Sequence, residues 1–284
     1  MSGRTRRSWL VTGATGFLGP HVVRAIRARG DSVVAIARGA VASPLRFDEE
    51  VERVDRDLSA ARAFDGFAPE LVVNVAAASR VGDCERDPAW AHAMNAELPV
   101  VLGAAFSGAR LVHVSTDLVF GHQAVPEHGF AETDEPVPAS VYGASKLEGE
   151  RALASARPDA AIVRLPLLFG ESFGRGLGAS DALLEAWRRG ERPRLFTDEF
   201  RTPLDVEAAA SALVGLALGD FRGLVHVAGV ERLSRYELGE RVAARRFGDG
   251  GDHALHLEAT TRVQLGLEDR PRDTSLDSRR WRDL

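Results

Sequence analysis

Lysine is nearly absent from this chain. Lys146 is the only one in 284 residues, and all the other basic side chains among the 36 lysines and arginines are arginine. Tyrosine is almost as rare, with Tyr142 and Tyr236 alone. An arginine would supply the same charge as Lys146, but not a compact ammonium group on a thin, rotatable stem. This scarcity draws attention to the stretch 142–146, where the lysine and one of the two tyrosines stand together.

The sequence also lacks features that mark other classes of protein. One cysteine, Cys84, excludes an intrachain disulfide and fits a reducing compartment, so we expect a cytoplasmic location. No apolar run is long enough to span a membrane, and glycines interrupt the apolar stretch after Arg7, so we expect neither a signal peptide nor a membrane partner. A net charge of −5 gives no indication of a nucleic-acid partner.

A glycine-rich turn follows the first predicted strand. Trp9–Val11 is a short apolar run, Gly13, Gly16 and Gly19 follow it, and apolar residues then recur at helical spacing over 20–29. Strand, glycine turn and helix form the context of a dinucleotide fingerprint, because glycine lets the backbone approach a pyrophosphate and the helix N-terminus offers N–H groups. The alternative is a glycine turn that binds nothing.

The end of the second predicted strand indicates which dinucleotide would bind. Ser32–Ala37 is apolar and is followed by Arg38, with no acidic residue at the strand end. An acid at this place binds the ribose 2′-hydroxyl of NAD, whereas an arginine accommodates the 2′-phosphate of NADP. We therefore predict NADP, with NADPH preferred over NADH. A solvated arginine in an arginine-rich chain is the alternative.

Six apolar runs alternate with helical segments over the first part of the chain, at 9–11, 32–37, 51–54, 71–77, 110–114 and 160–163. This alternation predicts an α/β fold with a doubly wound parallel sheet. After Gly170 the alternation loosens, and we expect helices at 179–189, 205–218 and 234–246. We predict an NAD(P)-binding domain over 1–165, with the helix near 205–218 packed back on it, and a smaller substrate-binding lobe over 166–284.

Two predicted helices carry polar residues of interest. In the first, from 83 to 107 with a kink expected at Pro99, Asn95 is a poor helix former in mid-helix, which suggests a polar contact. In the second, Tyr142 and Lys146 are one helical turn apart and share a face. A cation beside the phenol would lower its pKa from ~10, which makes a proton donor usable near neutral pH. An accidental pair on a surface helix is the alternative.

The polar loop at 119–140 contains two histidines, His122 and His128. Their spacing and setting do not match a metal site, and we predict that the chain has none.

Five short motifs, spread over nearly the whole chain, carry a family resemblance. They are the turn TGATGFLG at 12–19, the strand end STDLVF at 115–120, Tyr142 with Lys146, the turn FRTP at 200–203 and RPRDTSL at 270–276. Together they resemble the extended short-chain dehydrogenase/reductase superfamily, in particular its dTDP-4-dehydrorhamnose reductase branch. The resemblance implies a Rossmann-type fold with a smaller C-terminal lobe, and an oxidoreductase that reduces a nucleotide-linked keto-sugar with NADPH. It also implies a homodimer formed through the helices that hold Asn95 and Tyr142.

The resemblance assigns roles to individual residues. Thr116 hydrogen-bonds the substrate oxygen, Tyr142 donates the proton, and Lys146 lowers the pKa of the tyrosine and binds the cofactor ribose. The implied cofactor-binding residues further include Gly13, Thr15, Gly16, Phe17, Leu18, Gly19, Arg38, Asp57, Leu58, Ala76, Ala77, Ala78 and Asn95. The implied substrate contacts are Ser79, Thr116, Asp117, Leu167 and Arg201.

The sequence departs from the branch at positions that face the sugar in the family. Leu118 replaces a usual tyrosine, Leu167 replaces a usual tryptophan, and Asp83 and Glu85 match an acidic pattern only in part. Two alternatives therefore stay open. One is an NADP-binding regulatory subunit without turnover, similar to the methionine adenosyltransferase β subunit. The other is a sugar-nucleotide epimerase or dehydratase, although dehydratases usually carry an acidic pair after the threonine and only Asp117 follows here.

Overall fold

The chain forms two compact units, each assembled from separate stretches of sequence. The computed structural model describes residues 5–37, 51–55, 64–248 and 256–284. Unit 1 comprises Met1–Thr116, Ser140–Arg164 and Glu207–Val225, and unit 2 comprises Asp117–Ala139, Leu165–Val206 and His226–Leu284. The assignment of 1–165 to cofactor binding and of 166–284 to substrate binding stays a prediction.

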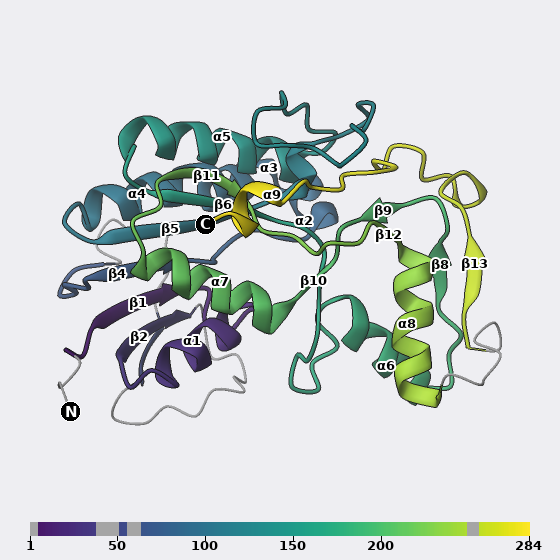
Figure 1. Ribbon diagram of the computed structural model, residues 1–284, viewed down its shortest axis with the longest axis horizontal. Coiled ribbons are helices and arrows are strands. Elements are labelled where there is room, and N and C mark those ends of the chain that lie inside the picture. Colours follow the sequence, from purple (N-terminus) through teal and green to yellow (C-terminus); the bar gives the residue numbers. More distant parts are fainter. Residues whose placement is uncertain (1–4, 38–50, 56–63, 249–255) are drawn as a thin grey trace. The chain divides into compact units, whose positions relative to one another are not determined.

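A seven-stranded sheet forms the centre of unit 1 (Figure 1). Its order is β11 (Gly223–His226), β6 (Ala161–Leu165), β5 (Arg110–Thr116), β4 (Leu71–Asn74), β1 (Ser8–Thr12), β2 (Ser32–Ala37) and β3 (Val51–Asp55). The pairs from β5 through β4, β1 and β2 to β3 are parallel. The chain winds outward from β1 in both directions, as in a Rossmann-type sheet. The predicted fold is confirmed, and β11 adds a strand that the sequence pattern did not indicate.

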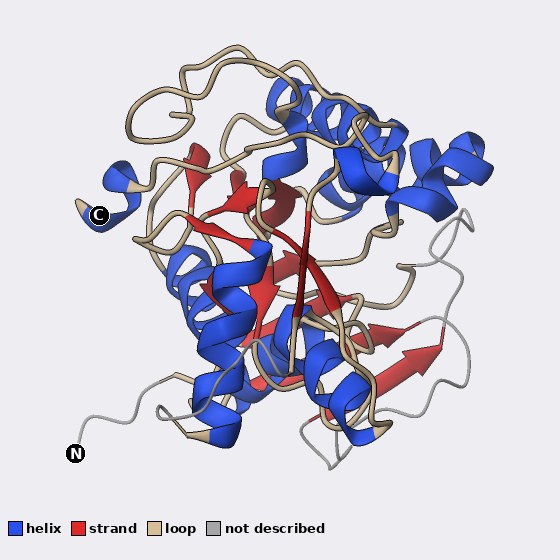
Figure 2. Ribbon diagram, turned by 90° about the vertical axis from the view of Figure 1, so that its right-hand side faces the viewer, coloured by secondary structure: helices blue, strands red, loops and turns tan. Residues whose placement is uncertain are grey.

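Helices cover both faces of this sheet. In Figure 1, α1 (Gly19–Arg27) and α7 (Val206–Leu218) lie on one side, and α4 (Leu98–Ala105) and α5 (Val141–Ala156) lie on the other. Figure 2 shows strands in red and helices in blue in a view turned by 90°. Within the described ranges, no helix combines the length and the apolar character needed to cross a membrane.

The segment predicted as one helix from 83 to 107 is divided into four pieces. They are α2 (Val81–Arg86), α3 (Pro88–His92), the π-helical turn η1 (Ala93–Glu97) and α4. Proline is tolerated at the start of a helix because it has no N–H to leave unpaired there, and Pro88 and Pro99 both stand in such positions. The irregularity therefore lies in the turn before Pro99, as a π turn around Asn95.

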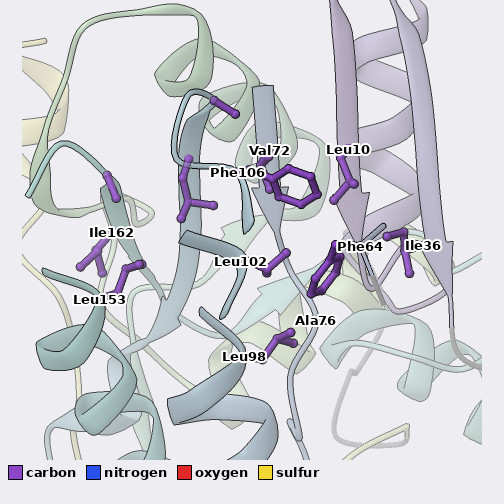
Figure 3. Packing of buried hydrophobic residues seen from close by; sticks show 13 residues of the cluster. Leu10, Ile36, Phe64, Val72, Ala76, Leu98, Leu102, Phe106, Leu153 and Ile162 are labelled. Carbon is purple, nitrogen blue, oxygen red and sulfur yellow. The ribbon is translucent and has the colours of Figure 1, made fainter. Parts of the chain in front are cut away.

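The core of unit 1 lies between the sheet and the helices on one face (Figure 3). Leu10, Val72 and Leu111 come from three neighbouring strands, and Leu102 of α4 and Leu153 of α5 belong to the same cluster. All five are at most 1% exposed. Burial of each such side chain contributes ~1.5–3 kcal/mol relative to leaving it in water. This packing fixes α4 and α5 against the sheet.

Unit 2 is built from short strand pairs and two longer helices. The pairs are β7 (Leu168–Phe169) with β10 (Leu204–Asp205), β9 (Phe200–Arg201) with β12 (Leu233–Ser234), and β8 (Arg194–Phe196) with β13 (Glu258–Thr260). The helices are α6 (Ala179–Arg188) and α8 (Arg235–Phe247), together with the short α9 (Arg279–Arg282). The bounds of α6 and α8 lie within one residue of the predicted helices at 179–189 and 234–246.

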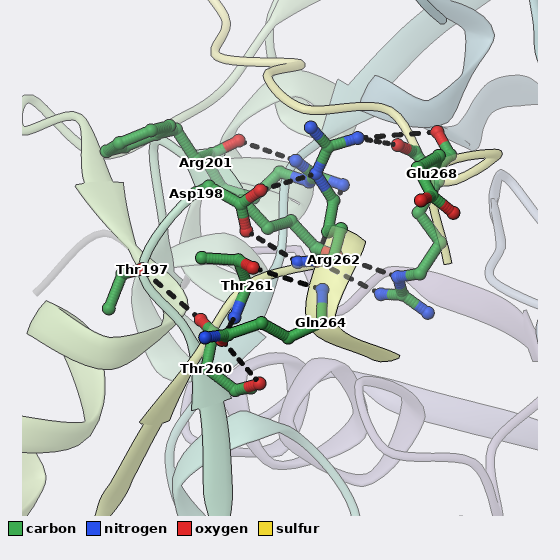
Figure 4. A network of polar contacts seen from close by, with 11 residues as sticks. Thr197, Asp198, Arg201, Thr260, Thr261, Arg262, Gln264 and Glu268 are labelled. Carbon is green, nitrogen blue, oxygen red and sulfur yellow. Dashed lines mark hydrogen bonds and ion pairs between the residues drawn. The ribbon is translucent and has the colours of Figure 1, made fainter. Parts of the chain in front are cut away.

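Polar contacts join the C-terminal ends of strands β8 and β13 (Figure 4). The carboxylate of Asp198 accepts the Arg262 backbone N–H at 2.9 Å and pairs with its guanidinium at 3.3 Å. The backbone N–H of Thr197 donates to the Thr260 carbonyl at 2.8 Å. This part of unit 2 is thus held by directed polar contacts, which leave no periodic apolar pattern in the sequence.

Candidate active site

The start of α5 is fixed by two side chains. The Ser140 hydroxyl accepts the Gly143 N–H at 3.1 Å, which is the usual N-cap contact. The carboxylate of Glu85, on α2, accepts the Val141 N–H at 2.9 Å. Tyr142 follows directly in the first turn, half-buried against a small cluster that includes Cys84. The first turn of α5, and with it the backbone of Tyr142, is therefore held in place by Ser140 and Glu85.

Lys146 connects α5 to the end of β5. Its side chain is 1% exposed, and its ammonium donates to the Val114 carbonyl at 2.7 Å. The nitrogen also lies 3.3 Å from Nε2 of His113. Val114 stands two residues before Thr116, the last residue of β5. Unit 1 thus holds the three predicted catalytic residues on one helix face and one strand end.

Burial changes the acidity of this lysine. Removal from water disfavours the ammonium and lowers the pKa of Lys146 from 10.5 to about 8, although the Glu150 carboxylate one turn later acts in the opposite direction. Glu150 is itself buried and is held by the Arg164 guanidinium, with contacts of 2.7 and 3.0 Å. Lys146 therefore changes charge much closer to neutral pH than an exposed lysine does.

The end of β5 carries two hydroxyls. Thr116 is buried, and Ser115 beside it has a buried hydroxyl oxygen with no hydrogen-bond partner among the described residues. A buried hydroxyl without a partner costs roughly 1–3 kcal/mol, so such a group fits a place where a polar ligand completes its contacts.

In the glycine turn before α1, the backbone packs too closely against other backbone atoms to leave room for a side chain at Gly13 or Gly19. Gly13 has a φ of 67°, and a Cβ there would lie 2.7 Å from the backbone nitrogen of Ala76. A Cβ on Gly19 would overlap the Gly13 carbonyl oxygen. Gly16 is exposed, with Thr15 and Phe17 half-buried beside it and Leu18 buried. The turn therefore lies against the end of β4 and leaves its tip accessible, as approach of a pyrophosphate requires.

Asn95 is engaged with the protein itself. Its Oδ1 accepts the Ala78 N–H at 2.9 Å, and its Nδ2 donates to the Ala78 carbonyl at 3.0 Å and to the Ser145 hydroxyl at 3.0 Å. The polar contact suggested by the sequence is thus to the chain after β4 and to α5. Through it, Asn95 holds the backbone of Ala78, the last residue of the segment 76–78 that is predicted to lie along the cofactor.

Other predicted residues are placed as follows. Arg38, Asp57 and Leu58 lie outside the described residues. In unit 1, Ala77 is half-buried and Ser79 is exposed just after β4. In unit 2, Leu167 is half-buried and its carbonyl accepts the Leu204 N–H at 3.0 Å.

Asp117 and Arg201, both predicted substrate contacts, meet within unit 2. The guanidinium of Arg201 lies 3.3 Å from the Asp117 carboxylate, and the Thr274 hydroxyl donates to the same carboxylate at 2.7 Å. Arg201 also lies 3.6 Å from Glu199, which accepts two hydrogen bonds from Arg270, at 2.8 and 3.1 Å. Burial raises the pKa of Glu199, but the hydrogen bond from Arg270 and the neighbouring arginines outweigh it and hold the pKa below its usual value. Two separate sequence motifs, at 200–203 and 270–276, thus join one charged cluster.

The sequence pattern does not indicate three buried polar residues that form a row ending at Lys146. They are Thr12 and Asn74, the last residues of β1 and β4, and His113 in the middle of β5. A signal was present, because each is a polar residue closing or interrupting an apolar strand that was itself predicted correctly.

Comparisons with known proteins agree along the length of the chain. The model of the RmlD substrate binding domain family matches residues 7–284. The probable low-salt glycan biosynthesis reductase Agl14 of Haloferax volcanii is 32% identical over 94% of this chain and 88% of its own length. The dTDP-4-dehydrorhamnose reductase of Mycobacterium tuberculosis is 30% identical, over 99% of this chain and 88% of its own. The methionine adenosyltransferase 2 subunit beta of Danio rerio is 32% identical, over 82% of this chain and 72% of its own length.

Solved structures show the same fold. A hypothetical dTDP-4-dehydrorhamnose reductase from Sulfolobus tokodaii superposes with a TM-score of 0.79 at 28% identity, covering 99% of this chain and 94% of its own. The dTDP-4-dehydrorhamnose reductase of Bacillus anthracis in complex with NADP has a TM-score of 0.80 at 20% identity, covering 99% and 92%.

Proposed function

Because the chain belongs to the RmlD substrate binding domain family, whose model matches residues 7–284, we propose that it reduces a nucleotide-linked keto-sugar with NADPH. The resemblance predicted from the five motifs is confirmed by this match, and relatives across nearly the full length are named reductases. The observation that carries the proposal is the buried Lys146 ammonium, which joins the helix of Tyr142 to the strand that ends in Thr116.

In the proposed reaction each of the three residues has a separate task. The reduced nicotinamide, when bound, supplies the hydride. Tyr142 gives its phenolic proton to the carbonyl oxygen, so that the ketone becomes an alcohol. The Thr116 hydroxyl donates a hydrogen bond to the same oxygen as negative charge develops there. The ammonium of Lys146 stabilises the phenolate that Tyr142 leaves behind.

The residues near the ends of β1 and β4 fit a dinucleotide. The turn from Gly13 to Gly19 has an accessible tip next to α1, where a pyrophosphate is favoured by the helix N-terminus. Ala76–Ala78 offer small side chains on a backbone that Asn95 holds in place. Asp57 and Leu58 would lie near the adenine by family resemblance.

NADPH rather than NADH is proposed because Arg38 follows β2 where NAD-binding proteins have an acid. A charge-assisted contact to the 2′-phosphate should give NADPH a several-fold lower dissociation constant. Fluorescence titration of both cofactors tests this. Equal affinities in the wild type, or unchanged NADPH binding in Arg38→Ala, would contradict the assignment.

For the nucleotide sugar we propose contacts from Ser79, Asp117, Leu167 and Arg201, besides Thr116. Arg201 supplies a cation suited to a diphosphate, and its pairing with Asp117 and Glu199 holds the guanidinium in one orientation. The leucine at 167, in place of a larger aromatic residue, suggests that the sugar differs from that of the named rhamnose reductases.

The test is turnover. A panel of nucleotide 4-keto-sugars is incubated with the protein and NADPH, and the loss of reduced nicotinamide is followed by its absorbance. We expect at least one member of the panel to be reduced at a rate that depends on enzyme concentration. If none is consumed by a folded, NADPH-binding protein, the proposed activity is wrong.

A second candidate is an NADP-binding partner subunit without turnover. The similarity to the methionine adenosyltransferase 2 subunit beta favours it. On this alternative the wild type reduces no keto-sugar and Tyr142→Phe leaves partner binding unchanged, whereas the reductase proposal expects Tyr142→Phe to abolish keto-sugar reduction.

A further inference from the structure

A row of buried polar side chains crosses the sheet of unit 1 and ends at Lys146. In the strand register Thr12 of β1 is opposite Asn74 of β4, and Asn74 is opposite His113 of β5. None of the three has any exposed surface, and Lys146 of α5 continues the row at 1% exposure. Four elements therefore each contribute one polar group to a continuous chain of contacts shielded from water.

The donors in this chain have a defined order. The backbone N–H of Ala76 donates to the Thr12 hydroxyl oxygen at 3.3 Å, and that hydroxyl donates to Asn74 Oδ1 at 2.6 Å. The Asn74 amide nitrogen is then directed at Nδ1 of His113, at 2.9 Å. An amide nitrogen only donates, so Nδ1 accepts. Burial, and then the charge of Lys146, hold the pKa of His113 well below its usual value, so the ring is neutral and carries its hydrogen on Nε2.

This tautomer acts directly on Lys146. His113 Nε2 lies 3.3 Å from the lysine nitrogen. An Nε2–H and an ammonium are both donors and cannot bond to each other, whereas a neutral amine accepts from Nε2–H while donating to the Val114 carbonyl at 2.7 Å. The opposite tautomer would accept from an ammonium, but it requires the Asn74 amide to turn. That turn leaves the Thr12 hydroxyl hydrogen without its acceptor, at a buried site where an unpaired donor is costly.

We propose that Thr12, Asn74 and His113 are positioning residues that set the protonation state of Lys146. Their effect is opposite to that of the Glu150 carboxylate on α5, which favours the ammonium form of Lys146. Glu150 is in turn paired with the Arg164 guanidinium of β6. The ammonium would stabilise the phenolate of Tyr142, on the same helix, and only this role in catalysis rests on the proposed function. The row thereby determines at which pH the ammonium is available to the tyrosine.

The single lysine makes the test direct. When the protein is labelled with ¹³C at the lysine ε-carbon and has no lysine in a purification tag, it gives one NMR signal. The chemical shift of that signal reports the charge of Lys146 alone. In the wild type we expect a midpoint well below the 10.5 of an unperturbed lysine. Thr12→Val keeps the shape of the side chain but removes the hydroxyl that orients Asn74, so the amide turns freely and His113 accepts from the ammonium. The midpoint should then rise by about one pH unit or more.

Thr12→Ser is the matched control, because it restores the hydroxyl and should restore the wild-type midpoint. A merely structural role of Thr12 would leave the midpoint in place in both variants. The inference is overturned if Thr12→Val titrates like the wild type, or if Thr12→Ser shifts as far as Thr12→Val does.

Two further measurements do not depend on that variant folding. In His113→Gln the amide oxygen accepts from the ammonium, and the midpoint should again rise. In the wild type above pH 9, ¹⁵N shifts of the His113 ring should show the hydrogen on Nε2; a hydrogen on Nδ1 there contradicts the proposal. These titrations use neither substrate nor cofactor. A protein that shows the shifts but reduces no keto-sugar would refute the proposed function and leave this inference standing.

Discussion

At the scale of single residues, the surroundings of Lys146 suit an ammonium better than a guanidinium. The site is buried, and Val114 and His113, the hydrogen-bond neighbours of the lysine nitrogen within the described ranges, lie on one strand within reach of a single compact group. Lys146→Arg keeps the charge but introduces a wide planar fork. Displacement of the reacting groups by ~1 Å costs on the order of 100-fold in turnover, and we expect a loss of this size with the fold retained. Steady-state kinetics with circular dichroism checks it, and near-normal turnover would contradict the account.

The lowered pKa of Lys146 predicts a pH dependence of stability. The folded chain loses this proton near pH 8, whereas the unfolded chain keeps it to 10.5. Between these values the unfolded state binds more protons, so the free energy of unfolding should rise with pH. Urea denaturation at pH 7.5 and pH 9.5 measures the rise. Lys146→Met should be more stable than the wild type at pH 7.5 and should lose this part of the rise; an equal rise in both proteins would exclude Lys146 as its source.

Sequence patterns found the candidate catalytic residues but not their support. Tyr142 and Lys146 were conspicuous because their residue types are rare and one helical turn separates them. Thr12 and Asn74 look like ordinary polar residues at strand ends, and His113 like a single polar residue within an apolar strand. Only the register of β1, β4 and β5 aligns them in one row, and register is a property of the assembled sheet rather than of any one strand.

At the scale of elements, the crossing of α5 with the π turn depends on one glycine. A Cβ on Gly149 would overlap the Asn95 carbonyl oxygen, which belongs to the backbone and cannot move aside. Gly149→Ala should therefore destabilise the protein by about 1–3 kcal/mol, the usual range for overpacking. Denaturant unfolding measures the change.

Gly215 of α7 is the matched control, because a Cβ there meets no neighbouring atom. Gly215→Ala should instead stabilise by about 0.5–1 kcal/mol, since alanine is the better helix former. If Gly149→Ala is as stable as the wild type or more stable, the close approach at Gly149 does not limit the packing of α5.

The elements that the sequence predicted well are those with a strong local pattern. Strands β1, β2 and β4 and helices α6, α7 and α8 have continuous or periodic apolar residues. The sequence predicts regular helix at Ala93–Glu97, because the contacts made at this π turn, of Asn95 with Ala78 and with the backbone near Gly149, are to residues distant in sequence. The two-residue strands of unit 2 are too short to carry a periodicity.

At the scale of the whole molecule, we expect a homodimer. By family resemblance the helices that hold Asn95 and Tyr142 pair with their twins around a two-fold axis. Val101, on α4 in the same layer as α5, is an apolar residue that is 46% exposed. Light scattering at micromolar concentration should give a dimer for the wild type and a monomer for Val101→Glu. Val230→Glu, at a 77% exposed position of unit 2, should stay dimeric as the control. A monomeric wild type would refute the expectation.

We propose that this molecule reduces a nucleotide-linked keto-sugar and that Tyr142 supplies the proton. The most direct test of this proposal uses NADPH in which both hydrogens at C4 of the nicotinamide are replaced by deuterium, with the product analysed by mass spectrometry. The wild type should yield an alcohol that carries one deuterium on the former carbonyl carbon. Tyr142→Phe should bind NADPH as tightly and yield almost none. An undeuterated product from the wild type, or equal deuterium incorporation by Tyr142→Phe, would contradict the account.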